Sequence, residues 1–202
     1  MSQSLFSVLR DRIAAVKHPV ELIFDFDGTV ATLPVDWRGQ RALFHQHLIQ
    51  LGVVLPEIRR IDEMELEALE KHVDLSERIL AFRSELEASA APSVVIPDTL
   101  AILTTRENPI ANCRAHIISN NLRSTVEREL ARFNLRSRFS SVYGLDDTRK
   151  PKPATNAGLL LQSIHKINFS NCIMLGDSDH TDGEFCSRLG ISYINITNVS
   201  PK

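Results

Sequence analysis

The sequence predicts an α/β protein in which a parallel β-sheet lies between two layers of helices, forming a three-layer α/β/α core to which a small α-helical cap domain is added. From residue 93 onward, segments with strand character alternate with segments of helical periodicity, which is typical of a parallel sheet with helices on both faces. Residues 36–88, by contrast, contain no strand-like segment. Several predicted strands also end in Asp, Ser or Gly-Asp. Because ligands of such sheets bind beyond the carboxyl ends of the strands, we expect the functional site at that edge.

The first predicted elements are a helix and a strand. Residues 1–19 carry apolar side chains at the spacing of a core-facing helix, namely Leu5, Leu9, Ile13 and Val16. Residues 20–25 form an apolar run that predicts the first strand, and residues 31–35 resemble a linker. The polypeptide is therefore expected to leave the sheet soon after its first strand.

Three helices are predicted in the cap. The first covers residues 36–51 and ends at Gly52, and the second covers residues 56–73. The third opens at Asp74, which together with Glu77 matches a variant of the capping box. A small-residue and proline stretch, 89–93, then resembles a second linker. We therefore expect residues 1–31 and 93–202 to form the core, and residues 32–92 to form a cap that can rock over the site.

The rest of the sequence supplies the alternating elements of the core. The predicted helices cover residues 97–106, 121–133, 153–166 and 182–189. The predicted strands cover residues 115–119, 139–143, 171–175 and 191–196.

Composition narrows the function classes. With 202 residues and 43% hydrophobic content, the chain can bury one good core and a small accessory domain. A net charge of −2 gives no electrostatic reason to expect binding to nucleic acid or to an anionic membrane. Cys113, Cys172 and Cys186 form no Cys-x-x-Cys pair and predict reduced thiols. No apolar run approaches the ~18 residues of a membrane span, and charges within residues 1–19 argue against a secretory signal, so we expect a cytoplasmic protein.

The stretch with the most chemical information is Leu-Ile-Phe-Asp-Phe-Asp-Gly-Thr-Val at residues 22–30. Asp25 and Asp27 lie two residues apart at the end of the first strand, so they start out on the same side of the backbone. Two carboxylates this close are costly unless a cation or a shared proton relieves their repulsion. Gly28 falls at the wrong position for an EF-hand loop. The two remaining interpretations are a divalent-metal site and a turn with solvated aspartates.

This stretch resembles the first motif of the haloacid dehalogenase superfamily of phosphohydrolases, which is defined by four motifs in a fixed order. His-Ile-Ile-Ser-Asn-Asn at 116–121 is similar to the second motif, Lys150 before Pro-Lys-Pro to the third, and Gly-Asp ending at Asp177, with Asp182 following, to the fourth. Together the motifs span residues 22–194. The resemblance implies a Rossmann-like core of the phosphoglycolate phosphatase and β-phosphoglucomutase type, with a helical cap between the first and second motifs.

Within this resemblance, Asp25 is the expected nucleophile and Asp27 the expected general acid and base, with Ser119 and Lys150 as further catalytic residues. The expected cofactor is Mg²⁺, held by Asp25, Asp27 through its backbone carbonyl, Asp177 and Asp182. The expected phosphate and substrate contacts are Gly28, Arg38, Arg41, Ser119, Asn120 and Lys150. Two alternatives stay open from the sequence: Asp179 in place of Asp182, and Lys152 in place of Lys150.

The expected activity is hydrolysis of a small phosphomonoester, the only partner that the sequence predicts. A sugar phosphate, phosphoglycolate and a nucleoside monophosphate all fit at this stage. A phosphomutase of the same superfamily would keep all four motifs, and a non-catalytic phosphate- or metal-binding regulator is a further alternative. The presence of Asp27, which can activate water, favours the phosphatase.

Overall fold

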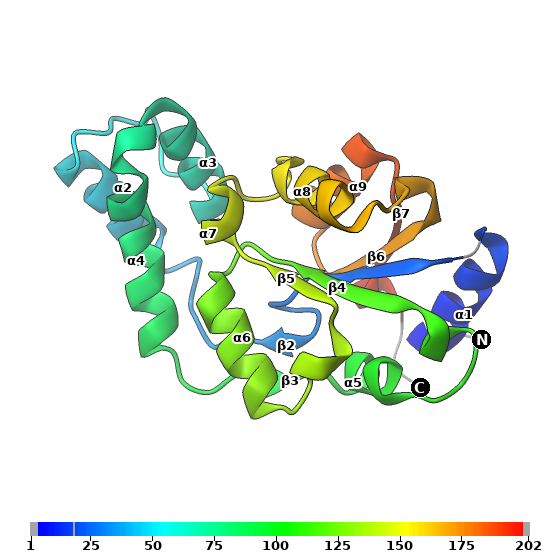
Figure 1. The fold of residues 1–202 in the computed structure, drawn as a ribbon. Helices are drawn as coiled ribbons and strands as arrows, with labels where there is room; N and C mark the ends of the chain where they lie inside the picture. The colour runs from blue at the N-terminus through cyan, green and yellow to red at the C-terminus, as the bar shows by residue number, and fades with distance from the viewer. Residues whose placement is uncertain (1–3, 18, 200–202) are drawn as a thin grey trace.

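A five-stranded parallel sheet forms the centre of the molecule. The computed structural model describes residues 4–17 and 19–199, and the strands lie in the order β5-β4-β1-β6-β7. Their bounds are Glu21–Phe24 for β1, Arg114–Ile118 for β4, Ser141–Tyr143 for β5, Cys172–Gly176 for β6 and Ser192–Asn195 for β7. All neighbouring strands in this sheet pair in parallel. The α/β prediction with a parallel sheet is confirmed, and β1 is the central strand (Figure 1).

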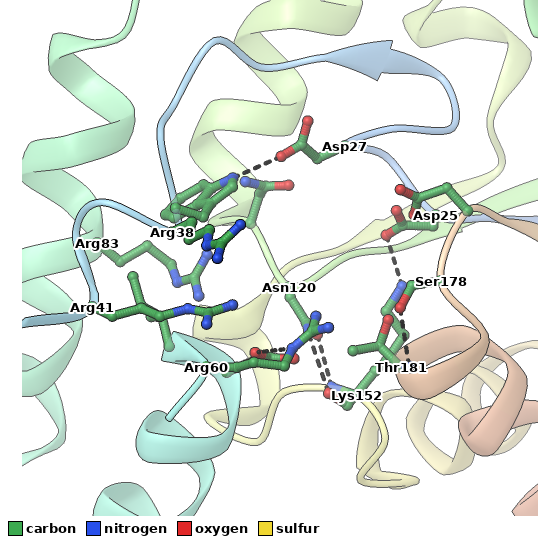
Figure 2. A pocket seen from close by; sticks show the side chains of 15 residues that line it. Asp25, Asp27, Arg38, Arg41, Arg60, Arg83, Asn120, Lys152, Ser178 and Thr181 are labelled. Carbon is green, nitrogen blue, oxygen red and sulfur yellow. Dashed lines mark hydrogen bonds and ion pairs between the residues drawn. The ribbon is translucent and has the colours of Figure 1, made fainter. Parts of the chain in front are cut away.

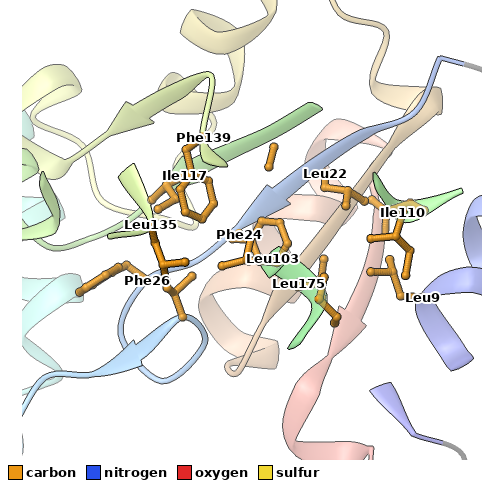
Figure 3. Close-up of a cluster of buried hydrophobic side chains, with 14 of the residues drawn as sticks. Leu9, Leu22, Phe24, Phe26, Leu103, Ile110, Ile117, Leu135, Phe139 and Leu175 are labelled. Carbon is orange, nitrogen blue, oxygen red and sulfur yellow. The ribbon is translucent and has the colours of Figure 1, made fainter. Parts of the chain in front are cut away.

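Helices cover both faces of the sheet. One face packs against α1 (Leu5–Ala15), α5 (Pro97–Thr104) and α6 (Arg123–Arg132), and the other packs against α8 (Asn156–His165) and α9 (Glu184–Leu189). Side chains of a strand alternate between faces, so Leu22 and Phe24 of β1 join the first layer of core packing, shown in Figure 3, while Ile23 joins the second. The carboxyl ends of the strands point toward the remaining helices.

A helical segment follows β1. It contains α2 (Arg41–Gln50), α3 (Ile61–Lys71) and α4 (Ser76–Ser89), and lies between two short strands, β2 (Ala31–Thr32) and β3 (Val94–Val95), which pair antiparallel. Its helices share a separate cluster of buried apolar side chains, to which Leu145 of the short helix α7 (Leu145–Thr148) also contributes. The prediction of three helices between two connecting segments is confirmed. Their assignment as an independent cap domain, residues 32–92, stays a prediction.

Several predicted element bounds were too wide. The first helix of the segment begins at Arg41 rather than residue 36, because an oxygen of the Asp36 carboxylate accepts a hydrogen bond from the Gly39 N–H (2.9 Å) and closes a turn there. The next helix begins at Ile61, after an extended Arg60. The helix predicted to open at Asp182 begins at Glu184, and Asp182 itself lies in a π-helical turn, Asp179–Gly183.

Residues 1–3, 18 and 200–202 of the predicted core lie outside the described part of the chain. Among the helices of residues 4–17 and 19–199, none has the length and apolar character needed to cross a membrane.

Candidate active site

Asp25 follows the central strand directly, and its surroundings are set by the turn behind it. Its backbone N–H still donates to the carbonyl of Leu175 on β6 (2.9 Å), so the residue is held at the sheet edge. Gly28 then adopts a φ of +82°, which favours glycine. A β-carbon at Gly28 would clash with the carboxylate of Asp177, so the turn also brings the first motif against the end of β6.

Three carboxylates converge at this edge. Asp25, Asp177 and Asp182 can each place one oxygen within 4.8 Å of the others. Burial raises the pKa of Asp25 well above its usual range, with Lys152 opposing the shift and Asp182 and Asp177 adding to it. Burial, followed by the charge of Asp182, raises the pKa of Asp177 to about 6. Such a group of three acids, of which Asp25 and Asp182 are buried and Asp177 is half-buried, is costly without a cation.

The cation present is Lys152. Its Nζ donates to Asp25 Oδ1 (2.7 Å), to Asp182 Oδ1 (2.6 Å) and to the carbonyl of Ile118 at the end of β4 (2.9 Å), and its side chain is only 2% exposed. Burial alone would lower the pKa of Lys152, but the charges of Asp182 and Asp25 outweigh it and raise the pKa. The ammonium group therefore stays charged and fixes one oxygen of Asp25.

The prediction that Lys150 occupies this position is wrong. Its Nζ instead lies 3.1 Å from Glu70 Oε1 of α3, at the exposed surface. The alternative, Lys152, takes the position because the side chain of Asn120 holds its backbone on both sides: Asn120 Oδ1 accepts from Lys152 N–H (2.7 Å), and Asn120 Nδ2 donates to the Lys152 carbonyl (3.2 Å). The loop of the third motif is thus anchored to the strand end of the second.

Ser119 lies at the end of β4 as predicted, and its side chain is buried in the turn that follows. Its hydroxyl donates to Asn121 Oδ1 and accepts from the Asn121 N–H, both at 3.0 Å. Asn121 Nδ2 in turn donates to Glu87 of α4 (3.0 Å), so this turn is tied to the helical segment. Asn120 and Asn121 both line the cavity described below.

Asp27 points away from the group of three acids. Its Oδ1 accepts from the Leu33 N–H (2.8 Å) and its Oδ2 from the indole Nε1 of Trp37 (2.9 Å). Burial raises its pKa, while these two hydrogen bonds oppose the rise. Its carboxylate oxygens are not part of the acid group, and a metal contact through its backbone carbonyl stays a prediction.

The alternative of Asp179 as a metal ligand finds no support. Asp179 is exposed, lies outside the acid group, and accepts a hydrogen bond from Asn195 Nδ2 (2.7 Å). Asp182 is instead 1% exposed, and its N–H donates to the Ser178 carbonyl (2.8 Å) across the π-helical turn. This turn is what directs Asp182 back toward Asp25.

A cavity of about 290 Å³ lies between the strand ends and the helical segment. Asp25, Asp27, Asp177 and Lys152 line it from the sheet, and Figure 2 shows the arginines of the helical segment on the opposite side. These are the predicted Arg38 and Arg41 together with Arg60 and Arg83, which were not predicted. One sequence signal was available for Arg83: it lies four residues after Ile79, on the side of its helix that faces inward.

Divalent magnesium fits this site. Mg²⁺ prefers carboxylate oxygens and keeps several waters, and three converging carboxylates beside a polar cavity provide that donor chemistry. Asp25, Asp177 and Asp182 are the residues that would hold it.

Comparison with known proteins agrees with this geometry. The family model for haloacid dehalogenase-like hydrolases matches residues 22–196. The protein belongs to this family. The resemblance drawn from its four motifs is therefore confirmed, and the protein is a hydrolase of the haloacid dehalogenase superfamily.

Solved structures of the same superfamily share its fold. A superfamily hydrolase from Ehrlichia chaffeensis is 21% identical with a TM-score of 0.55, and the match covers 91% of this chain and 95% of that one. A phosphatase of the superfamily from Thermococcus onnurineus is 18% identical with a TM-score of 0.54, covering 86% and 84%. YfnB from Bacillus subtilis, whose structure has bound magnesium and is described as revealing interdomain movement, is 17% identical with a TM-score of 0.54, covering 88% of each chain. A search of curated proteins gave no match.

Proposed function

We propose that this hydrolase is a magnesium-dependent phosphatase that cleaves a small phosphomonoester through an aspartyl-phosphate on Asp25. The observation that carries the proposal is that two neighbouring carboxylates, those of Asp25 and Asp27, lie in different environments. Asp25 contacts a buried lysine within a group of acids, whereas Asp27 is turned to the other side of the cavity and is held by Trp37 and Leu33. A nucleophile and a proton carrier need such different environments.

In the first half-reaction, an Asp25 oxygen attacks phosphorus and forms a P–O bond while the bond from phosphorus to the leaving oxygen breaks. Asp27 donates its proton to that leaving oxygen. In the second half-reaction, Asp27 accepts a proton from a water molecule that attacks phosphorus, and Asp25 is released. The raised pKa of Asp27 supports its role as a proton carrier.

Asp25, Asp177 and Asp182, with the backbone carbonyl of Asp27, would hold Mg²⁺. When bound, the ion would neutralise negative charge on the phosphoryl oxygens. Lys152 orients Asp25 through one oxygen and supplies positive charge beside the phosphoryl group. Asn120 binds the backbone of Lys152, so it contributes to phosphate binding by positioning this lysine.

The test is hydrolysis of p-nitrophenyl phosphate with Mg²⁺ and with a chelator, comparing wild type with Asp25→Asn. Asp11→Asn, an exposed residue on α1, serves as the matched control. We expect magnesium-dependent turnover in wild type and in the control, and a loss of about 10³-fold or more in Asp25→Asn, because the nucleophile is removed. Acid-quenched phosphoenzyme should form only when Asp25 is present. Full activity of Asp25→Asn would refute the proposed nucleophile.

A further inference from the structure

Charge is distributed unevenly around the cavity. The sheet side presents three carboxylates, of Asp25, Asp27 and Asp177, with the ammonium group of Lys152 among them. The helical segment contributes one carboxylate, of Asp62, and four guanidinium groups, those of Arg38, Arg41, Arg60 and Arg83. The cavity therefore has an acidic end at the strands and a basic end at the helices.

Two of the four arginines are already neutralised by carboxylates. Arg83 is buried and donates to both oxygens of Glu65 (2.9 and 2.6 Å), with Glu87 at 3.6 Å. Arg60 donates to Asp62 (3.1 Å). Within residues 4–17 and 19–199, neither Arg38 nor Arg41 has a carboxylate within 4.0 Å, although both line the cavity. Two positive charges at the basic end are thus without a counter-charge in the described part of the chain.

The position of these arginines indicates which part of a substrate they meet. Arg38 follows Trp37, whose indole donates to Asp27, and Arg41 begins α2 three residues later. In the proposed reaction Asp27 protonates the leaving oxygen, so the leaving group must lie on this side of the cavity. Figure 2 shows the side chains of Arg38 and Arg41 extending toward the cavity from the side opposite Asp25.

We propose that the leaving group of the substrate carries a second anionic group, a carboxylate or a further phosphate, and that Arg38 and Arg41 bind it. This inference rests on the proposed phosphatase function. Guanidinium groups match carboxylate and phosphate oxygens with paired hydrogen bonds, and an anion between them would relieve their mutual repulsion. The cavity, at about 290 Å³, lies at the lower limit for small-molecule sites, so the second anion is only a few atoms from the phosphoryl group.

Binding of non-hydrolysable phosphonates tests the proposal without relying on turnover. Propylphosphonate, 2-carboxyethylphosphonate and ethane-1,2-bisphosphonate share a short carbon chain and differ at its far end. Titrated calorimetrically into wild type in excess Mg²⁺, at least one of the two doubly anionic ligands should bind about tenfold more tightly than propylphosphonate, which is equivalent to about 1.4 kcal/mol. Which of the two binds more tightly distinguishes a carboxylate from a second phosphate. Arg38 is exposed and Arg41 half-buried, so solvent screening should keep the preference moderate and make it fall with added salt.

Variants test whether Arg38 and Arg41 cause the tighter binding of the doubly anionic ligands. In Arg41→Gln and Arg38→Gln the ratio of affinities should fall to about threefold or less. It should stay at the wild-type value in Arg78→Gln, an exposed arginine of α4 that does not line the cavity. Equal affinity of wild type for all three phosphonates would overturn the proposal, as would an equal weakening of all three in the arginine variants, since that places the arginines on the phosphoryl group. Hydrolysis of p-nitrophenyl phosphate, measured in parallel, reports separately on the phosphatase function.

Discussion

The indole Nε1 of Trp37 lies 2.9 Å from Oδ2 of Asp27, so a residue that precedes the first helix of the helical segment determines where the carboxylate after β1 points. The Trp37 ring also contacts Arg83, whose guanidinium group stacks over it with the central carbon 4.7 Å from the ring centroid. Arg83 is in turn paired with Glu65 and lies near Glu87, which accepts hydrogen bonds from Asn121 and Leu122 after β4. The helical segment and the strand ends are thus joined at two places, the proposed proton carrier Asp27 and the turn after β4.

The first prediction concerns this hydrogen bond. Trp37→Phe keeps the aromatic packing against Arg83 but removes the donor to Asp27, a hydrogen bond to a charged group that is worth about 1.5–3 kcal/mol. We expect kcat/KM, which reports the first half-reaction, to fall about 10- to 100-fold for an alkyl phosphate, whose leaving oxygen needs a proton. For p-nitrophenyl phosphate, whose leaving group departs without one, the loss of kcat/KM should be much smaller. A similar loss for both substrates would indicate that Trp37 acts only through folding.

The second prediction separates the two lysines. Lys152→Met should lower kcat by about 10²–10³-fold, because the charge beside Asp25 is lost. It should also destabilise the magnesium-free protein by roughly 3–5 kcal/mol, since Asp25 and Asp182 are left buried without their cation. Lys150→Met is the matched control, and its exposed pair with Glu70 should contribute no more than about 1 kcal/mol. Urea unfolding and steady-state kinetics measure both effects; a larger loss of activity in Lys150→Met would contradict the structural placement.

The third prediction concerns the metal. A ligand that binds only the folded state at 100 times its Kd stabilises it by about 2.7 kcal/mol, so Mg²⁺ should raise the Tm of a chain of this length by roughly 5–10 °C. Asp177→Asn should lose most of this increase, because Asp177 belongs to the acid group. Asp179→Asn, two residues further on and outside the group, should retain it. Thermal melts with and without chelator measure the rise in Tm for each variant. An equal rise in Asp177→Asn and Asp179→Asn would exclude Asp177 as a metal ligand.

The fourth prediction is a pH dependence of stability away from the active site. Glu129 of α6 accepts hydrogen bonds from the Ser93 hydroxyl (2.6 Å) and from Nε of Arg128 (3.0 Å) and of Arg132 (2.9 Å). Burial would raise the pKa of Glu129, but these bonds outweigh it and lower the pKa to about 2. The carboxylate therefore stabilises the fold fully above its ordinary pKa of 4.5, and this contribution declines as the pH falls from 4.5 toward 2.

Glu129→Gln should accordingly destabilise the protein by about 1.5–3 kcal/mol at pH 7, and the difference from wild type should shrink as the pH is lowered below 4.5. Urea unfolding at a series of pH values measures it. Because the same carboxylate holds Ser93, combining Ser93→Ala with Glu129→Gln should cost less than the sum of the single variants. A difference that does not change with pH would show that the hydrogen bonds to Glu129 do not depend on its charge.

Much of the fold could be predicted because it depends on local pattern, and the placing of strand-end residues could be predicted because it follows from the sheet topology. Strand-helix alternation predicted the parallel sheet, and residues at strand ends, such as Asp25 and Asp177, are brought together by topology alone. Lys152 could not be separated from Lys150 in this way. Both lie in a loop, and the choice depends on hydrogen bonds from Asn120, a residue 32 positions away in the sequence. Arg83 and Trp37 were hard to place for the same reason, since Arg83 pairs with Glu65 of another helix and Trp37 donates to Asp27 at the end of β1.

The pairing of β2 with β3 has a consequence for how this protein can change over time. Ala31 and Thr32 lie opposite Val95 and Val94, so the backbone that leaves the sheet after β1 is joined to the backbone that returns to it. The entropy of closing a loop grows only with the logarithm of its length, so helices between these strands can be lengthened, shortened or exchanged at little cost to the five-stranded sheet. Residues such as Arg38 and Arg41 belong to this replaceable portion, whereas Asp25, Lys152 and Asp177 do not. Residues that contact the substrate can therefore diverge in one stretch of the gene, while Asp25, Lys152 and Asp177, which are encoded on either side of it, stay unchanged.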